Sequence, residues 1–371
     1  MTAIEEIKKI AGDMRGYLAG AHNASGRKFV GVMHPIVPQE ILYAAGLHPF
    51  RLFPFPGEQI SLAHTHLHVD TSSIFRAIWD QVLKGQFSFL DGVVLPESCE
   101  TVSYFARGWR YHRPGDFVAT TAGLRFNKTK NALDFFAQDL RVLASTVSAF
   151  AGTEISTSSL ASAIRLFNDN RKLLQQIGEL RKSDSPLLTG LEAFQIFMAS
   201  HVMDKADNNK LLEKLLLELQ SRKPGPKPRA RILVSGPCVV DFRILAAMEE
   251  SGALIVADDT NFGSRSFSHM VEEGGDPYTA LAGGYTGISC PFSISVEHRL
   301  SSLLETVSHY KVEGVIFAIE RACESEKMDF PYLERELKAR NIPVIFIETE
   351  YLCNISPIQT RIDGFVESIT R

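Results

Sequence analysis

The sequence predicts an α/β protein with two doubly wound parallel-sheet domains of the Rossmann or flavodoxin-like kind and a helical middle region. Apolar strands alternate with helices in residues 1–130 and again in residues 229–371, a pattern typical of parallel sheets. Residues 131–228 have helical periodicity and no strand of comparable quality. The basic stretch "RKPGPKPRAR" at 222–231 is rich in Pro and Gly, and therefore predicts a linker before the second α/β domain.

The N-terminal domain begins with an amphipathic helical segment. Residues 28–54 then predict a strand, a Pro-marked turn, a helix ended by Gly46 and a second strand. The next helix is predicted at 71–86, where Thr71, Ser72 and Ser73 are candidate N-caps. The stretch "FLDGVVLPESCETVSYFARGWR" at 89–110 predicts a strand, a loop that carries Cys99 and another helix.

The C-terminal domain shows the same alternation. Its predicted strands and helices are, in order, the strand 232–236, the helix 239–252, the strand 253–259, the helix 295–312 after a polar stretch to about Pro291, and a strand–helix–strand unit over 315–348. Cys323 lies where the first strand of that last unit ends. The helices are long enough to be the crossovers that parallel strands require.

Composition excludes several classes of protein. With 371 residues and a formal charge of −4, the chain is long enough for two or three domains and has no basic field for nucleic acid or anionic lipid. We expect no membrane segment, because no stretch is long and apolar enough to span a bilayer. The five cysteines are scattered and form no CxxC pair, which favours reduced thiols and a cytoplasmic location.

Cys99 and Cys323 occupy matching positions. Each follows an apolar strand and precedes a helix, where backbone N–H groups and the helix dipole favour a thiolate. Ligands of open α/β sheets bind at this edge, so both thiols are candidate metal ligands. The alternative is that each is a small buried apolar residue.

Three further stretches have both a functional and a structural interpretation. "HTHLHVD" at 64–70 has alternate histidines, which on a strand would form one face and resemble a metal site, although an exposed strand edge is the simpler interpretation. "VSGPC" at 234–238 suits a phosphate or a plain strand-to-helix turn. Asp258, Asp259 and Arg265 predict either an ion network or a ligand site.

Four segments together resemble the 2-hydroxyacyl-CoA dehydratases, whose subunits are related to those of ATP-dependent benzoyl-CoA reductase. They are "GVMHPIVPQEILYAAGLHPFRL", "LDGVVLPESCE", "IVADDTNFGSRSF" and "GVIFAIERACESEKMDFPYLERELKARNIPVIFIE". The last is the most specific, since family members have a cysteine followed by an acidic stretch there. The resemblance covers nearly the whole chain and is strongest to the smaller, beta-type subunit.

The resemblance implies a [4Fe-4S] cluster held by three cysteines, two of which match Cys99 and Cys323. The position of the expected third cysteine holds Ser72, and an oxygen ligand is harder than a thiolate. Either the ligand set is unusual, with Cys290, Cys238 or His66 as additional candidates, or the subunit has lost its cluster.

The resemblance also implies the reaction. Such enzymes, which serve anaerobic amino-acid fermentation, dehydrate an (R)-2-hydroxyacyl-CoA to an enoyl-CoA through a ketyl radical. A separate ATP-hydrolysing iron–sulfur activator supplies the electron, and the beta-type subunit acts as a heterodimer with a related alpha-type subunit. Two alternatives are a subunit of a benzoyl-CoA reductase-type enzyme and a cluster-free structural partner. The sequence identifies no catalytic acid or base.

Overall fold

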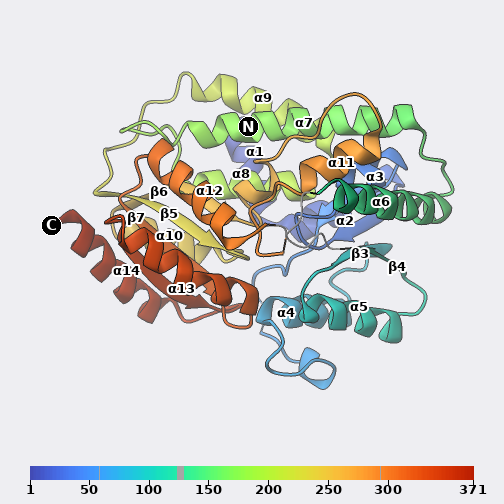
Figure 1. The fold of residues 1–371 in the computed structure, drawn as a ribbon, viewed down its shortest axis with the longest axis horizontal. Helices are drawn as coiled ribbons and strands as arrows, with labels where there is room; N and C mark the ends of the chain where they lie inside the picture. Colours follow the sequence, from blue (N-terminus) through green and yellow to red (C-terminus); the bar gives the residue numbers. More distant parts are fainter. Residues whose placement is uncertain (58, 123–128, 293) are drawn as a thin grey trace.

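The computed structural model describes residues 1–371 except 58, 123–128 and 293, and in this part of the chain eight strands form two parallel four-stranded sheets. The N-terminal sheet has the order β2-β1-β3-β4 and the C-terminal sheet the order β6-β5-β7-β8 (Figure 1). The strands are β1 (Phe29–Val32), β2 (His48–Arg51), β3 (Gly92–Glu97), β4 (Phe117–Ala122), β5 (Ala230–Gly236), β6 (Ala253–Thr260), β7 (Gly314–Glu320) and β8 (Val344–Thr349). Within each sheet the chain order is 2-1-3-4, as in flavodoxin-like folds.

Helices cover both faces of the N-terminal sheet. Neighbouring residues of a strand point to opposite faces, and Val93 and Val94 of β3 enter different apolar clusters. Val93 packs with α4 (Ser73–Leu83) and α5 (Glu100–His112), whereas Val94 packs with α3 (Gln39–Ala44) and α6 (Lys130–Ala151). The doubly wound arrangement predicted for this part of the chain is confirmed.

The C-terminal sheet has the same construction. Ile316 of β7 packs with α10 (Phe242–Glu250) and α14 (Ile355–Thr370). Its neighbours Val315 and Phe317 face α12 (Val296–His309) and α13 (Glu324–Lys338) on the opposite side. The strands are consequently buried on both faces, which explains why they read as unbroken apolar runs.

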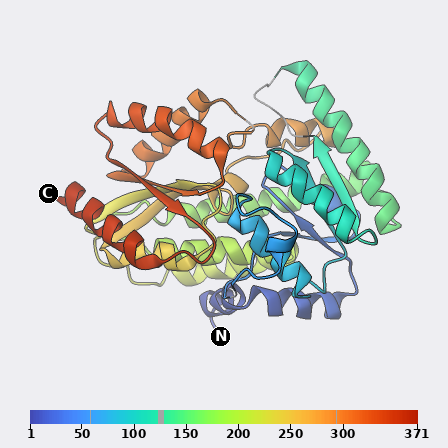
Figure 2. The same ribbon diagram turned by 90° about the horizontal axis from the view of Figure 1, so that it is seen from below.

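The helical middle region connects the two sheets. It contains α6, α7 (Thr157–Glu179), α8 (Gly190–Val202) and α9 (Lys205–Leu219). Helices α7 and α9 lie across the upper part of the molecule in Figure 1. Helix α8 is buried nearly all round, between β2, β6, α10 and the N-terminal helix α1 (Ala3–Gly12), which α2 (Met14–Ser25) follows. Figure 2 shows the two sheets on opposite sides of the molecule. The domain limits at 130 and 228 stay predictions.

Some elements differ from the sequence prediction. The stretch before Pro291, expected to be a polar connection, contains α11 (Pro277–Tyr285). Its signal was present, because Asp276 caps the helix by accepting a bond from Thr279 N and a proline follows as the first helical residue. The strand β4 and the helix α14 had not been predicted either.

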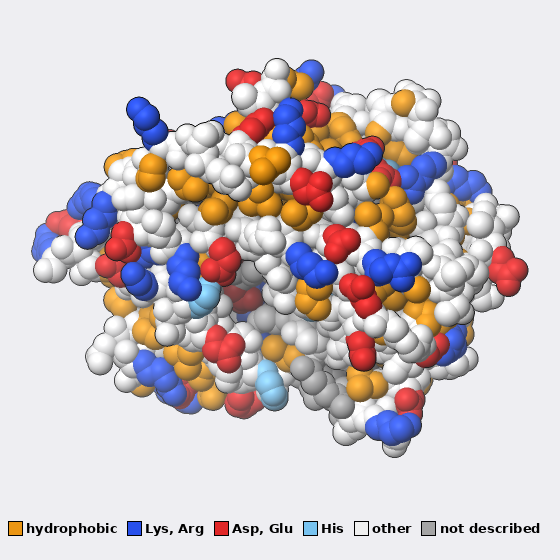
Figure 3. Space-filling model, turned by 90° about the horizontal axis from the view of Figure 1, so that it is seen from above, with side chains coloured by type: hydrophobic (Ala, Val, Ile, Leu, Met, Phe, Trp, Pro, Cys, Tyr) orange, Lys and Arg blue, Asp and Glu red, His pale blue; other side chains and the backbone are white. Residues whose placement is uncertain are grey.

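The surface agrees with the charge balance of the sequence. Acidic and basic side chains are interspersed on the face shown in Figure 3, and no large basic area gathers there. Among the described residues, no helix has the length and apolar character needed to cross a membrane.

Gly236 serves strand packing. A Cβ atom at this position would lie 1.9 Å from the carbonyl oxygen of Ala318 in β7, a backbone atom that cannot move without disturbing the sheet. The glycine of "VSGPC" is therefore explained by the approach of β5 to β7, without a bound phosphate. We expect Gly236→Ala to lower the free energy of unfolding by about 1–3 kcal/mol or more in urea denaturation. Gly364→Ala, where a Cβ would meet no atom within 4 Å, is the control and should cost little.

Candidate functional site

The strand order places the candidate site at the centre of each sheet. In a sheet of order 2-1-3-4, strands 1 and 3 are the two central strands. The chain leaves strand 1 toward one side of the sheet and strand 3 toward the other, and ligands bind at the carboxyl ends of these two strands. The residues that follow these ends are His34 after β1, Cys99 after β3, Cys238 after β5 and Cys323 after β7. Three of the five cysteines thus lie at the positions where such folds bind ligands.

The carboxyl edges of the two sheets meet. Glu320, the last residue of β7, is buried and accepts bonds from Ser73 N at 2.8 Å and Ser73 Oγ at 2.9 Å at the start of α4. Tyr351 N, beyond β8, donates to the same Ser73 Oγ at 2.8 Å. A further bond joins the two halves between the end of β2 and the residue after β6, where Arg51 Nη1 donates to Asn261 O at 3.2 Å. These bonds hold the two ligand-binding edges against each other.

The three residues expected to hold iron occupy equivalent places. Ser72, Cys99 and Cys323 are each the residue before the first turn of a helix, α4, α5 and α13 respectively, and none of the three side chains caps its helix. Ser72 adjoins the Ser73–Glu320 contact, and Cys323 N donates to Glu320 O at 2.9 Å, so these two positions share one neighbour. Cys99 packs into the apolar cluster that also contains α4.

The thiols differ from the expected thiolates. Burial raises the pKa of the Cys99 thiol, and the backbone N–H groups at the start of α5 only partly oppose it. Burial, followed by the carboxylate of Glu326, raises the pKa of Cys323 far above its ordinary value. Desolvation therefore outweighs the helix dipole, and both sulfurs are protonated unless a cation binds them.

The donor set fits an iron–sulfur cluster in two of three positions. Cys99 and Cys323 supply the ligand type that such clusters use, and Ser72 supplies a hydroxyl. In the described part of the chain, no group of three or more His, Cys, Asp or Glu side chains is close enough to hold a metal ion. The described residues therefore show no complete set of ligands from His, Cys, Asp and Glu, and Cys99, Cys323 and Ser72 stay candidates.

The additional candidates are a histidine and a cysteine that have other partners and a cysteine whose thiol is protonated. Cys290 is buried with Sγ 3.4 Å from His34 Nε2, and burial raises its pKa to about 11. Burial raises the pKa of Cys238 to about 12. His66 Nδ1 accepts a bond from Trp79 Nε1 at 3.1 Å.

The predicted histidine strand is wrong. Residues 64–70 form a short 3₁₀ helix, Ala63–Thr65, and turns, so His64, His66 and His68 do not share a strand face. His68 pairs with Asp70 at the surface, at 3.3 Å. The local bond from Leu67 N to Ala63 O closes a helical turn that alternation alone could not reveal.

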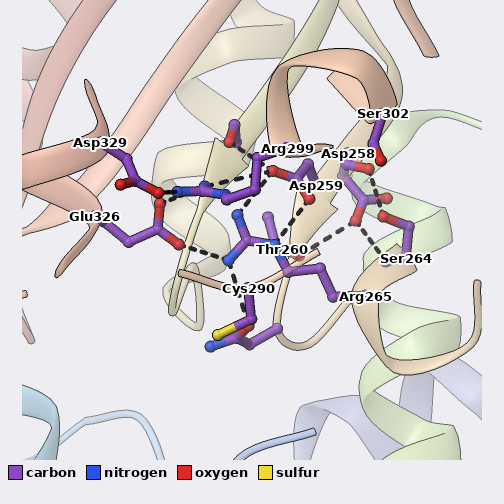
Figure 4. A network of polar contacts seen from close by, with 12 residues as sticks. Asp258, Asp259, Thr260, Ser264, Arg265, Cys290, Arg299, Ser302, Glu326 and Asp329 are labelled. Carbon is purple, nitrogen blue, oxygen red and sulfur yellow. Dashed lines mark hydrogen bonds and ion pairs between the residues drawn. The ribbon is translucent and has the colours of Figure 1, made fainter. Parts of the chain in front are cut away.

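The acidic and basic residues after β6 form an ion network (Figure 4). Arg265 Nη2 and Nε donate to the two carboxylate oxygens of Asp259 at 2.7 and 2.8 Å, and its Nη1 donates to Glu326 Oε1 at 2.6 Å. Arg299 of α12 bridges Glu326 at 2.6 Å and Asp329 at 2.5 Å. Of the two functions that the sequence allowed for Asp259 and Arg265, the structure shows the ion network.

The network anchors the helix that Cys323 begins. Glu326 lies three residues after Cys323, in the first turn of α13. Burial alone would raise the pKa of Glu326, but Arg265 and Arg299 lower it below its usual value, so the carboxylate stays charged. The network therefore fixes the first turn of α13 to β6 and α12, and with it the position of Cys323.

Two residues of the site were not predicted. Ser73 was considered only as a helix cap, and Glu320 only as the end of a strand. Glu320 was detectable, because a carboxylate that follows six buried strand residues must find a partner at the sheet edge. Its partner, 247 residues away, was not detectable from local patterns.

Comparison with known proteins shows the family of this chain. The family model described as "2-hydroxyglutaryl-CoA dehydratase, D-component" matches residues 36–369. The chain is 22% identical to the (R)-phenyllactyl-CoA dehydratase beta subunit of Clostridium sporogenes over 98% of both chains. It is 24% identical to the (R)-2-hydroxyglutaryl-CoA dehydratase subunit beta of Acidaminococcus fermentans, over 99% of this chain and 98% of the relative. It is also 24% identical to one of the subunits of benzoyl-CoA reductase from Thauera aromatica, over 92% of this chain and 91% of the relative. The chain belongs to the family of 2-hydroxyglutaryl-CoA dehydratase D-components.

Proposed function

We propose that this chain is the iron–sulfur, beta-type subunit of an (R)-2-hydroxyacyl-CoA dehydratase, a carbon–oxygen lyase. The observation that carries the proposal is the pair of partly buried thiols, Cys99 and Cys323, placed at the ligand-binding edges of two sheets that face each other. Beta subunits of two such dehydratases match the chain over nearly its whole length, which supports the assignment. The free thiols agree with a reducing, cytoplasmic setting.

The reaction explains why an electron-transfer group is needed. Loss of water from a 2-hydroxyacyl-CoA removes a proton beta to the thioester, and that proton is not acidic enough for an ordinary general base. When bound, a [4Fe-4S] cluster supplies one-electron transfer at low potential. A single electron added to the substrate thioester would give a ketyl radical anion, which expels the alpha hydroxyl group as hydroxide and leaves an enoxy radical with an acidic beta proton. Loss of that proton and return of the electron give the enoyl-CoA and water.

The chain's own residues would hold and shield this centre. Cys99 and Cys323 supply thiolates, and Ser72 lies at the third position. Glu320 and Ser73 hold the two edges together, and both residues are buried at the contact. The partners are a related alpha-type subunit, an ATP-dependent iron–sulfur activator and an acyl-CoA. ATP is used by the activator.

Iron analysis tests the proposal. The chain, purified without oxygen alone and with its co-expressed partner subunit, should contain about four irons and four acid-labile sulfides per copy. Cys99→Ala and Cys323→Ala should each lose most of this iron and the paramagnetic resonance signal of the reduced cluster. Cys353→Ala, at the end of a different strand, is the matched control and should keep both. Iron confined to the partner subunit would contradict the proposal.

Two alternatives give different outcomes. The relative from Thauera aromatica favours ring reduction of an aryl-CoA, and assays of the assembled enzyme with 2-hydroxyacyl-CoA and benzoyl-CoA separate the two reactions. Ser72 favours a cluster-free structural subunit. In that case the natural chain would hold almost no iron, and Ser72→Cys would raise its iron content.

A further inference from the structure

A small buried cavity lies where the N-terminal sheet, the helical middle region and the C-terminal half meet. Its volume is about 30 Å³, more than a single water needs. Three cationic side chains line it, Arg51 from β2, Arg171 from α7 and Lys205 from α9. The cavity is separate from the thiols discussed above, none of which lines it.

Only one of the three cations has a carboxylate partner. Arg171 Nη2 donates to Glu40 Oε1 at 2.6 Å and to Tyr285 Oη at 2.9 Å, and Glu40 is fully buried. Within the described ranges, neither Arg51 nor Lys205 has a carboxylate oxygen within 4.0 Å. Asp204, which precedes Lys205, is paired with Arg27 at 2.5 Å.

Arg51 is a buried guanidinium with few partners. It is 2% exposed, and its contacts in the described residues are the bond to Asn261 O and the face of the Phe262 ring, 4.8 Å from the ring centroid. Its Nε has no hydrogen-bond partner. The nearby Cys238 does not balance the charge, because burial raises the pKa of that thiol to about 12. Burying an unbalanced charge is costly, so a counterion is expected.

Lys205 contributes a second positive charge when it is protonated, and an anion beside it would favour the protonated form. It is 6% exposed, and its Nζ donates to Ser200 O at 2.5 Å and Ser200 Oγ at 3.3 Å, which leaves one of its three N–H groups for the cavity. Gln39 Oε1 has no partner either, and a half-turn of its amide would direct N–H donors into the same space.

We propose that the cavity binds one small monovalent anion, a halide or the carboxylate group of a small ligand, between Arg51 and Lys205. The anion places one negative charge between the two side chains and accepts N–H bonds from both, and the cavity is too small for a nucleotide or a CoA phosphate chain. The site holds together residues of β2 and α9, and so stabilises the contact between the first sheet and the helical region.

Thermal unfolding of the full chain tests the proposal. Sodium bromide and sodium formate are each compared with sodium gluconate at equal ionic strength and pH 7. The melting temperature of the wild-type chain should rise with the concentration of bromide or formate and then reach a plateau. Arg51→Met and Lys205→Met should lose the gain, and Lys210→Met, an exposed lysine of α9, should retain it. The proposal would be overturned by a melting temperature that rises equally in gluconate, bromide and formate. A rise of the same size in the wild type and all three variants would also overturn it.

A second measurement does not depend on the variants. Crystals of the wild-type chain soaked in bromide should show an anomalous peak between Arg51 and Lys205, and formate in the soak should displace it if a carboxylate is the natural occupant. Bromide at other places only would overturn the proposal. The result is independent of iron, because a chain that binds no cluster still has both cations.

Discussion

Arg265→Met is expected to lower the free energy of unfolding by about 3–5 kcal/mol. The guanidinium is 1% exposed and is bound to Asp259 and Glu326 by three bonds of 2.6 to 2.8 Å. Methionine fills much of the same space but leaves Asp259 without its two shortest hydrogen bonds. Removing one member of a buried ion pair leaves an uncompensated charge. Urea denaturation followed by circular dichroism measures the loss.

A surface arginine gives the control for this experiment. Arg335 is paired with Glu336 at 3.0 Å, but its side chain is 68% exposed, and exposed pairs contribute about 0–1 kcal/mol. If Arg265→Met costs no more than Arg335→Met, the network does not anchor α13. Because α13 begins at Cys323, the iron content of Arg265→Met should also fall relative to that of Arg335→Met.

Lys205→Met is expected to change how stability depends on pH. Burial lowers the pKa of Lys205 from 10.5 to about 7, and Arg171 and Arg51 add to the effect while Asp204 and Glu40 oppose it. Between pH 7 and about 10 the unfolded chain therefore holds a proton that the folded chain lacks, so the stability of the wild type rises with pH. The slope is at most about 1.4 kcal/mol per pH unit, and methionine removes it.

Comparison of the two proteins isolates this residue. The stability of Lys205→Met relative to the wild type should be greatest near pH 7 and should decrease toward pH 10, in gluconate buffer that keeps the cavity free of small anions. The histidine that faces the cavity, His201, is neutral throughout this range, because burial holds its pKa well below the usual value. Lys210→Met should follow the wild type at every pH. Parallel curves for Lys205→Met and the wild type would show instead that Lys205 stays protonated in the folded chain over this pH range.

The sequence predicted the fold because the fold follows local rules. Apolar runs such as "GVIFAIE" mark strands buried on both faces, and helices between them impose parallel pairing. The same alternation located Cys99 and Cys323 before the helices that they begin. Helix α11 was missed because its glycines and small residues give little amphipathic contrast, although its cap was readable.

The site was predicted less completely, since contacts across the molecule decide it. Burial of Cys99 and Cys323 raises their pKa values, and no sequence pattern reports how deeply a strand end is covered. Likewise, Arg51 ends an ordinary strand, and only the assembled structure shows that no carboxylate in the described residues faces it.

The bond between Ser73 and Glu320 has a consequence for biosynthesis. Each sheet is built from neighbouring strand–helix–strand units, which can form soon after they leave the ribosome. The contact between the sheets joins residues 247 positions apart, so it must wait until β7 has been synthesised. During that interval the first half of the chain exposes the edge that Glu320 later covers. The proposed metal centre, which would lie where the two edges meet, could be inserted only after β7 has been synthesised.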